Sequence, residues 1–582
     1  MPLPPPDGCL RADVACALVP DSIGITSNNM TNTSSALTVP LPLSRAVTST
    51  TPARLVLINP PALAGRTNER TFSGGIGVSR RLKPLEREKA TILPIDFLYL
   101  AAVAEKAGST VSFVDLLIER HTGHQAERFC LDRIGLAAPG VTTWVGVRLS
   151  MPSLAQDLEF ANRMKALLPA ARVFVFGAAI MATLDHWIDR ALVDYVFFGE
   201  PEAFFDQVLA AEDPRSVPAV LSPATYVPLA GADLYDEKKN TAAYAKWVKV
   251  TDISALPRPA WHLLDMSRYT RSGDPGDAGV YVQASRGCPL GCSMCPYMLI
   301  EGLPWRRNEI DGVVDEIEYL NKSFGVYRVR FRDPNFGFNR QYSRALAEAL
   351  IARGVKLEAT AETSLEVFDE DTLRKLFQAG IRTITTGVET NDAACMESIG
   401  QKIKINTRLG ERIRFCQSVG YHLYGTYCLG MPEETWDTVE NTWRFANELD
   451  IESGFTVLTP FPGTPMYWRS IAEGLLSRKM QFAQWNGYTA TVRSYALTTR
   501  DLDMARWWAR METIIPYRRQ RAAATSSAEL GRFYLRHAPH FLWRQVCRSY
   551  VWWRRRWPST AWPVAASAGP ASNTQGRLAQ PS

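Results

Sequence analysis

Apolar residues recur along this chain in two patterns, short runs of strand length and longer stretches with helical spacing. Order begins with the run RLVLI at residues 54–58, which an Asn-Pro-Pro turn ends. A short apolar run bounded by turn residues is typical of a buried strand entering a loop. A helical pattern follows over 94–108, and a second apolar run, over 109–115, predicts the next strand.

The same alternation continues to residue 202. We expect strands over 144–150, 171–177 and 193–202 and helices over 153–169 and 185–192. Strands that alternate with helices favour a doubly wound parallel sheet, whose ligands bind beyond the carboxyl ends of the strands. Residues 54–212 are therefore predicted to form a Rossmann-like domain that binds a nucleotide or a cofactor.

A second α/β unit is predicted over 276–475, after a proline-containing linker at 213–275. Strand and helix patterns alternate six times in roughly 190 residues from Val280 onward. This length suggests a partial (βα)6 barrel, because a full eightfold barrel needs about 250 residues. Catalysis in such a barrel belongs at the carboxyl ends of its strands.

The ends of the chain differ from these two units. Residues 1–53 are rich in Pro, Ser, Thr, Ala and Asn, which predicts a disordered leader, although a start at Met30 is an open alternative. Residues 476–557 are predicted to form a helical C-terminal region, and 558–582 a disordered tail. The fold class expected for the whole chain is α/β.

Composition supports an ordinary globular protein. The 582 residues are 46% hydrophobic and 21% charged, within the range of soluble domains. The longest apolar run, twelve residues from Val173, is shorter than the 18 or more that a membrane span needs. The N-terminus has no basic segment followed by an apolar one, so we expect a cytoplasmic protein.

Charge is unevenly distributed. Eight arginines and no acidic residue follow Glu529, and subtracting these eight charges from the net +6 leaves the first 529 residues at −2. The body is therefore not expected to bind nucleic acid. Aromatic and apolar residues alternate with the arginines over 532–557, which suits peripheral contact with a membrane surface; a packed helix with snorkelling arginines is the equal alternative.

Three of the ten cysteines lie on one short loop. Cys288, Cys292 and Cys295 have the spacing C-x3-C-x2-C directly after the strand pattern at 280–287. Three thiolates suit an iron–sulfur centre with one open corner, whereas a closed zinc site would need a fourth ligand that is absent at finger-like spacing. Core packing is the remaining alternative, but the intervening glycines and proline do not favour it. The other seven cysteines are scattered, and Cys395, Cys416 and Cys428 are expected to pack as small hydrophobic residues.

This region resembles the radical S-adenosylmethionine (SAM) superfamily, whose signature is this cysteine spacing after the first barrel strand. The resemblance places Tyr297 as the aromatic residue two positions after the third cysteine. It implies that Asp333 in FRDPNF, Glu389 in GVET and Gly430 in the GMPEET segment lie near SAM. The segment PFPGTP from Pro460 is similar to the exit of the sixth strand.

The chemistry that this resemblance implies is radical chemistry. A 4Fe-4S cluster on the three cysteines would bind SAM at its open iron and cleave it with one electron, giving a 5′-deoxyadenosyl radical. An electron donor such as flavodoxin or ferredoxin would supply that electron. Seen alone, Asp333 or Glu389 would be interpreted as a solvated loop carboxylate.

The N-terminal unit resembles the cobalamin-binding domain fused to many radical SAM enzymes. The resemblance implies cobalamin contacts from five residues in its matching segments: Pro60, Asp115, Gly177, Gly199 and Glu200. One departure is that the D-x-H-x-x-G motif, which supplies a histidine to cobalt, is absent. We therefore expect cobalamin without a histidine ligand, with a cofactor-free domain as the alternative.

Together these patterns predict a cobalamin-dependent radical SAM methyltransferase that acts on an unactivated carbon of a small-molecule or lipid-like substrate. A radical cyclase or oxidoreductase with the same cofactors is the first alternative. A noncatalytic redox or cobalamin-carrying protein is the second, and it would not cleave SAM.

Overall fold

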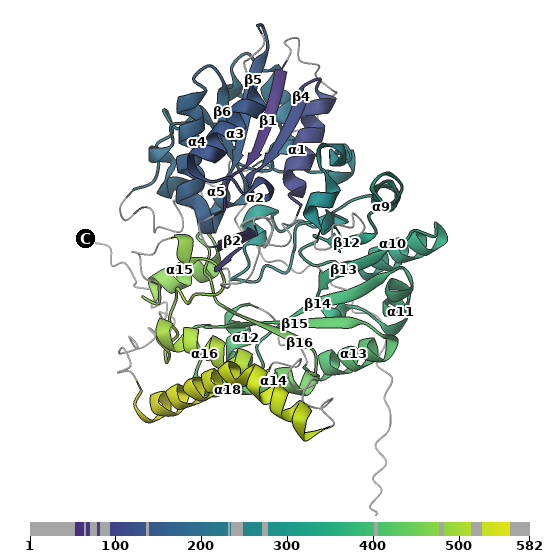
Figure 1. Ribbon diagram of the computed structural model, residues 1–582, viewed down its shortest axis with the longest axis vertical. Coiled ribbons are helices and arrows are strands. Elements are labelled where there is room, and N and C mark those ends of the chain that lie inside the picture. The colour runs from purple at the N-terminus through teal and green to yellow at the C-terminus, as the bar shows by residue number, and fades with distance from the viewer. Residues whose placement is uncertain are drawn as a thin grey trace, which may run out of the picture. The chain divides into compact units, whose positions relative to one another are not determined.

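A computed structural model describes most of the chain, in two parallel sheets with their helices (Figure 1). The residues described are 53–62, 66–69, 78–81, 93–135, 139–230, 233, 248–270, 278–400, 406–476, 482–513 and 526–558. The predicted α/β class with parallel sheets is confirmed. The leader expected over 1–53 and the tail expected from 558 lie, except for their last and first residues, outside the described residues.

The first sheet has the strand order β4-β1-β5-β6-β7-β8. All neighbouring pairs are parallel except β7 with β8, which is an antiparallel edge pair. The order reverses at β1, which pairs with both β4 and β5. Its strands are β1 (Ala53–Asn59), β4 (Thr110–Asp115), β5 (Thr142–Arg148), β6 (Arg172–Phe176), β7 (Tyr195–Phe197) and β8 (Val220–Leu221).

Alternate residues of β1 explain why this sheet is buried on both faces. Val56 and Ile58 belong to one hydrophobic cluster, and Leu55 and Leu57 belong to another. Successive side chains of a strand point to opposite faces, so the two clusters lie on the two sides of the sheet. The helices of this part are α1 (Ile95–Lys106), α2 (Leu116–Glu119), α3 (Gly123–Ile134), α4 (Leu154–Leu167), α5 (Ala178–Thr183) and α6 (Phe205–Ala210).

One helix predicted here is wrong. Residues 185–192 form two short 3-10 turns, and the α-helix lies earlier, at α5. Asp185 accepts hydrogen bonds from the Tyr226 hydroxyl and the Leu229 backbone, and the buried Trp187 donates to Thr183. These contacts hold the segment in an irregular turn and prevent a regular helix.

The second sheet contains six parallel strands in reverse chain order, β16-β15-β14-β13-β12-β9. The strands are β9 (Val280–Val282), β12 (Arg328–Phe331), β13 (Glu358–Thr363), β14 (Ile381–Glu389), β15 (His422–Leu429) and β16 (Glu452–Val457). The helices that connect or follow them are α8 (Tyr297–Ile300), α9 (Ile310–Phe324), α10 (Arg340–Ala352), α11 (Glu370–Gln378), α12 (Ala393–Ser398), α13 (Asn406–Val419), α14 (Trp436–Leu449) and α15 (Pro465–Ala472).

Two small antiparallel pairs accompany the main sheets. Strands β2 (Arg66–Glu69) and β3 (Val78–Arg81) form one, and β10 (Ser285–Arg286) and β11 (Arg306–Arg307) form the other. The second pair frames the segment that contains the three clustered cysteines.

The last helices are α16 (Thr499–Glu512) and α18 (Ser527–Arg556), and α18 bends along its length in Figure 1. Pro539 lies inside α18, and a proline within a helix removes a backbone hydrogen bond and kinks it. Cys547 and Val551 of α18 are buried in the same core cluster as Trp508 of α16. The second half of the helix is therefore packed against the body of the protein.

Four arginines of α18 form ion pairs with the body of the protein, as the packed-helix alternative predicts. Arg544 and Arg548 pair with Glu512, and Arg554 pairs with Asp501 at 2.6 Å. Arg555 reaches Glu440 at 2.8 Å. These four arginines neutralise carboxylates of the body, as a packed helix would require. None of the described helices is long and apolar enough to cross a bilayer.

Candidate functional site

The three-cysteine loop leaves the second sheet directly after its edge strand β9. Gly287 has a φ of +81°, and a Cβ atom there would lie 2.1 Å from the Pro304 carbonyl oxygen, so only glycine fits. The Cys288 N–H donates to the Gly302 carbonyl at 3.1 Å, and the Cys295 N–H donates to the Cys292 carbonyl at 3.0 Å. The backbone of the loop is therefore fixed by its own hydrogen bonds.

The thiols of this loop alter one another's pKa values. Burial raises the pKa of Cys288 and of Cys295, and the Cys292 side chain raises both further. Three neighbouring thiolates thus need a positive centre, which a metal cluster supplies. Among the described residues no three His, Cys, Asp or Glu side chains already form a metal-holding group. Three cysteines are the donor set of an iron–sulfur cluster with an open corner.

Two carboxylates approach this loop from the carboxyl ends of adjacent strands. Ala359 and Ala361 of β13 are buried in the core, so Glu362 points to the opposite face of the sheet. Glu389 ends β14 in the left-handed region, with a φ of 64°, where the register with β15 shifts. The Glu362 side chain is exposed at this face, and partial desolvation together with the charge of Glu389 raises its pKa.

Glu389 also raises the pKa of Cys295, after burial and the other two thiols, which places it within electrostatic reach of the loop. Tyr297 starts α8 and belongs to the same group, because its pKa is raised by burial and then by Glu362 and Glu301. The structure thus brings Cys295, Tyr297, Glu362 and Glu389 together. Three of these four were predicted from the sequence.

Asp333 and Gly430, which were predicted to lie near SAM, form hydrogen bonds with other groups of the protein. The Asp333 carboxylate accepts hydrogen bonds from the Ala284 N–H at 2.9 Å and from the Ser285 hydroxyl at 2.5 Å. Burial raises its pKa to about 7. The Gly430 N–H donates to the Glu434 carboxylate at 3.0 Å. Both residues therefore shape the backbone at strand ends, and Asp333 fixes the segment that leads into the cysteine loop.

The residues predicted at the first sheet also lie at its carboxyl edge. Pro60 follows β1, and Asp115 ends β4, where its carboxylate accepts from Asn59 and from the Tyr269 hydroxyl, both at 2.9 Å. Gly199 has a φ of +138°, and a Cβ there would lie 2.1 Å from the Val248 carbonyl oxygen. Close backbone packing explains this glycine without any ligand.

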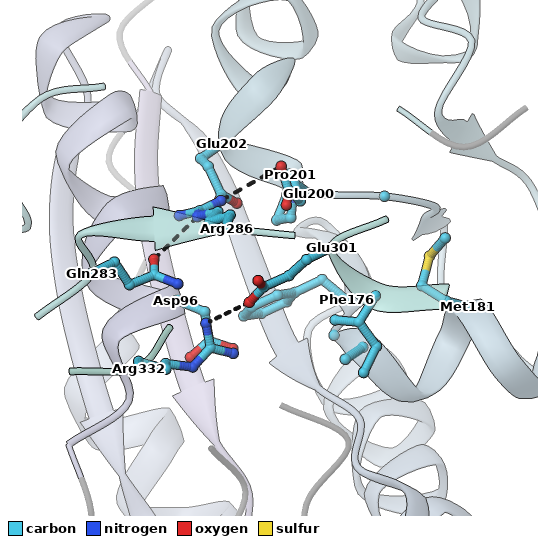
Figure 2. Close-up of a pocket in the computed structure, with 14 residues that line it drawn as sticks. Asp96, Phe176, Met181, Glu200, Pro201, Glu202, Gln283, Arg286, Glu301 and Arg332 are labelled. Carbon is cyan, nitrogen blue, oxygen red and sulfur yellow. Dashed lines mark hydrogen bonds and ion pairs between the residues drawn. The ribbon is translucent and has the colours of Figure 1, made fainter. Parts of the chain in front are cut away.

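A small pocket lies where this edge meets the base of the cysteine loop (Figure 2). The first sheet and its helices contribute Asp96, Phe176, Gly177, Ala178, Met181, Gly199, Glu200, Pro201 and Glu202, and the second part contributes Gln283, Arg286, Ile300, Glu301 and Arg332. Its volume of about 60 Å³ is below the 300–1,000 Å³ typical of small-molecule sites. A whole cofactor would therefore have to part these walls.

Ion pairs hold the walls of the pocket together, as Figure 2 shows for Arg286 and Glu202. These two buried groups are 2.6 Å apart, and Arg306 pairs with Glu200 at 2.8 Å. We call Arg286, Arg306, Glu200 and Glu202 the arginine clamp. Both arginines belong to the β10–β11 pair, so the clamp ties the base of the cysteine loop to the edge of the first sheet.

A third ion pair, between Glu301 and Arg332, lines the same pocket. Glu301 accepts the Gly287 N–H at 2.9 Å and pairs with Arg332 at 3.3 Å. Burial raises the pKa of Glu301, while Arg332 lowers it. Glu301 therefore links the cysteine loop to the end of β12.

Sequence patterns missed Glu362, Glu301, Glu202, Arg286 and Arg332 as parts of this site. Glu202, Glu362 and Arg332 had a usable signal, since each stands at the carboxyl end of a predicted strand. The others make pairs that depend on tertiary contacts, and Glu202 and Arg286 are 84 positions apart.

Comparison with known proteins places this site in a family context. The sequence profile of the Radical SAM superfamily matches residues 282–446, which include the three cysteines, Glu362 and Glu389. The match begins in β9 and ends in α14.

Two relatives carry methyltransferase names. An uncharacterized methyltransferase of Pyrococcus horikoshii is 30% identical over 241 residues, which are 41% of this chain and 51% of the relative. The cytidylyl-2-hydroxyethylphosphonate methyltransferase of Streptomyces wedmorensis is 24% identical over 425 residues, 66% of this chain and 78% of the relative. The chain thus spans about half of the first relative and about four fifths of the second.

A solved structure shares the fold over both sheets. It is the radical S-adenosylmethionine methyltransferase TsrM of Kitasatospora setae, with cobalamin and a [4Fe-4S] cluster bound. The similarity has a TM-score of 0.56 at 19% identity and covers 73% of this chain and 80% of TsrM.

Proposed function

Because residues 282–446 are a radical SAM domain, we propose that this chain is a cobalamin-dependent radical SAM methyltransferase. Its reaction is the methylation of an unactivated carbon in a small-molecule or lipid-like substrate. The observation that carries this proposal is the three-cysteine loop, whose Cys295 lies within electrostatic reach of Glu389, which in turn acts on Glu362.

The proposed roles of the residues follow from their positions. Cys288, Cys292 and Cys295 would hold a 4Fe-4S cluster. Glu389 and Glu362 would accept hydrogen bonds from the amine or ribose hydroxyls of SAM, and Tyr297 would shield the loop from water. When bound, the cluster supplies an electron for SAM cleavage, and cobalamin supplies a site that carries the methyl group.

The domain boundaries belong to the same proposal. Residues 54–212 would be the Rossmann-like cobalamin domain, 213–275 the linker, 276–475 the partial (βα)6 barrel and 476–557 the helical C-terminal region. The reversal of strand order at β1 supports the first assignment, since ligands of such sheets bind beyond the strand ends where the order reverses. Six parallel strands in sequential order support the second.

Cobalamin would bind in this domain without a histidine ligand. Leu116 and Leu117 follow Asp115, where the motif D-x-H-x-x-G would place its histidine, and none of the described residues that line the pocket is a histidine. Gly177 and Gly199 line the pocket at the carboxyl edge of this sheet, which is where a ligand of the domain would bind. An electron donor such as flavodoxin or ferredoxin would complete the system.

The decisive test begins with the cluster. Cys288→Ala, Cys292→Ala and Cys295→Ala combined should reduce iron content to background after anaerobic reconstitution and abolish reductive cleavage of SAM to 5′-deoxyadenosine. Cys416→Ala is the matched control, since this thiol is buried in the core away from the loop, and it should keep both properties. Unchanged iron in the triple variant would disprove the site.

A second measurement separates the reaction types. SAM with an isotopically labelled methyl group should transfer the label to enzyme-bound cobalamin and then to the product. A product without label, formed together with 5′-deoxyadenosine, would favour the radical cyclase or oxidoreductase. Cluster binding without any SAM cleavage would favour the noncatalytic protein.

A further inference from the structure

Helix α18 exposes apolar side chains on the face opposite to its paired arginines. Leu542, Val546, Trp553 and Trp557 are 69%, 48%, 48% and 53% exposed, and we call them the outer stripe. Their spacings of four, seven and four residues place them on one face of the helix. Trp552, adjacent in sequence, is 67% exposed.

The opposite face explains why the stripe points outward. Cys547 and Val551 are buried in the core, and the guanidinium groups of Arg544, Arg548 and Arg554 pair with carboxylates of α16. In this half of α18 the paired arginines therefore face the protein, while Trp553 and Trp557 face outward. The anchoring on α16 holds the stripe in a fixed direction.

Exposed apolar surface of this kind indicates a partner. The chemistry of the surroundings favours an anionic lipid surface. Arg532, Arg536 and Arg556 are exposed along α18, and no acidic residue follows Glu529 in the chain. Tryptophan combines an apolar ring with a polar N–H and is enriched at the level of lipid headgroups.

A second copy of the chain fits this surface less well. In a two-fold symmetric contact the same patch faces itself, so α18 would meet α18. Arginines of both copies would then approach one another with no carboxylate of α18 beyond Glu529 to neutralise them. An anionic bilayer neutralises these charges and takes up the stripe at the same time.

We propose that the outer stripe of α18 docks this protein on anionic membranes, with Leu542, Val546, Trp553 and Trp557 entering the headgroup region and Arg532, Arg536 and Arg556 contacting lipid phosphates. This inference is independent of the proposed reaction, since it uses no residue of the cysteine loop or of the arginine clamp. It places the protein where an apolar substrate would be concentrated.

The test uses the full-length reconstituted protein and co-sedimentation with vesicles. Binding to mixed phosphatidylglycerol–phosphatidylcholine vesicles should exceed binding to pure phosphatidylcholine and should weaken with salt. Leu542→Ser combined with Trp553→Ser should reduce the partition coefficient at least about tenfold, because two large apolar side chains no longer enter the lipid. Arg532→Gln, Arg536→Gln and Arg556→Gln should each reduce it about fivefold on anionic vesicles only.

Matched controls keep the result interpretable. Leu192→Ser with Val227→Ser removes two apolar side chains that are 70% and 87% exposed elsewhere, and binding should not change. Iron content and the thermal unfolding midpoint should be equal in all variants, because every altered side chain is exposed. Failure of the wild type to bind anionic vesicles at low salt would overturn the proposal. So would a dimer that Leu542→Ser and Trp553→Ser convert to a monomer without any vesicle binding.

Discussion

Single residues of this protein show how burial alters ordinary acids. Glu316 of α9 is buried, and burial raises its pKa to about 8, although Trp261 and Arg258 oppose this rise. Burial also raises the pKa values of Asp333 and Glu434 to about 7 each. The folded protein therefore holds protons near neutral pH that the unfolded chain releases.

These raised pKa values predict a stability that falls as pH rises. A carboxyl group whose pKa is higher in the folded state stabilises fully below its unfolded pKa of about 4, and this contribution is lost as pH rises to the folded value. Glu316→Gln removes one such group while keeping its size. At pH about 8 the variant should be more stable than the wild type by up to about 4 kcal/mol, and near pH 5 the two should be similar.

Urea unfolding of the two proteins at both pH values measures this difference. Because the other raised carboxylates are common to both proteins, the difference isolates Glu316. A constant difference at both pH values would mean that Glu316 is ionised in the folded protein.

At the scale of elements, most strands and helices could be predicted from the sequence, but the segments held by tertiary contacts could not. Apolar runs located β1, β4, β5 and β6, because buried parallel strands are continuously apolar. The turn at 185–192 was missed because Asp185 and Trp187 are held by contacts from distant segments. The cysteine loop and Glu389 were predicted because each belongs to a local sequence motif. The ion pair between Glu202 and Arg286 was not predicted, because it joins residues that are distant in the sequence.

The helical phase of α18 was readable from its sequence, yet its orientation was not. Arg544, Arg548 and Arg555 recur on one face and Leu542, Val546 and Trp553 on another, and either face could have pointed outward. The orientation of α18 is determined by its acidic partners on α16, Asp501 and Glu512. The local sequence of α18 contains no signal for these partners.

The arginine clamp should make a large contribution to the contact between β10 and the first sheet. Glu202→Leu leaves the buried Arg286 without its nearest carboxylate, so the free energy of unfolding should fall by about 3 kcal/mol or more. Adding Arg286→Met should restore a substantial part of the loss, because two apolar groups then replace an unpaired charge. Chemical denaturation of the single and double variants gives both values.

The control for the clamp is an exposed ion pair of similar geometry. Arg328 and Glu358 lie 3.2 Å apart on adjacent strands with both side chains about half exposed. Glu358→Gln should change stability by less than about 1 kcal/mol. If Glu202→Leu costs no more than this control, the clamp does not hold the cysteine loop in place.

At the scale of the whole molecule, α18 is an integral part of the described fold rather than an appended tail. Tyr550 packs edge-on against Trp436 of α14, and the Arg555 guanidinium lies over the Trp508 ring of α16. Helix α18 therefore packs against helices α14 and α16, and its outer stripe remains exposed. Stability and surface binding depend on the same helix, but on opposite faces of it.

Removing α18 should therefore lower stability as well as vesicle binding. Truncation after Thr525 deletes the buried Cys547 and Val551 and leaves Asp501 and Glu512 without their arginines. Each fully buried apolar side chain contributes about 1.5–3 kcal/mol, so the free energy of unfolding should fall by about 3–6 kcal/mol. Truncation after Pro558 keeps α18 and should change neither stability nor vesicle binding. Equal unfolding midpoints for the two truncated proteins in urea would show that α18 contributes nothing to the core, and the fixed direction of its outer stripe would then lose its physical basis.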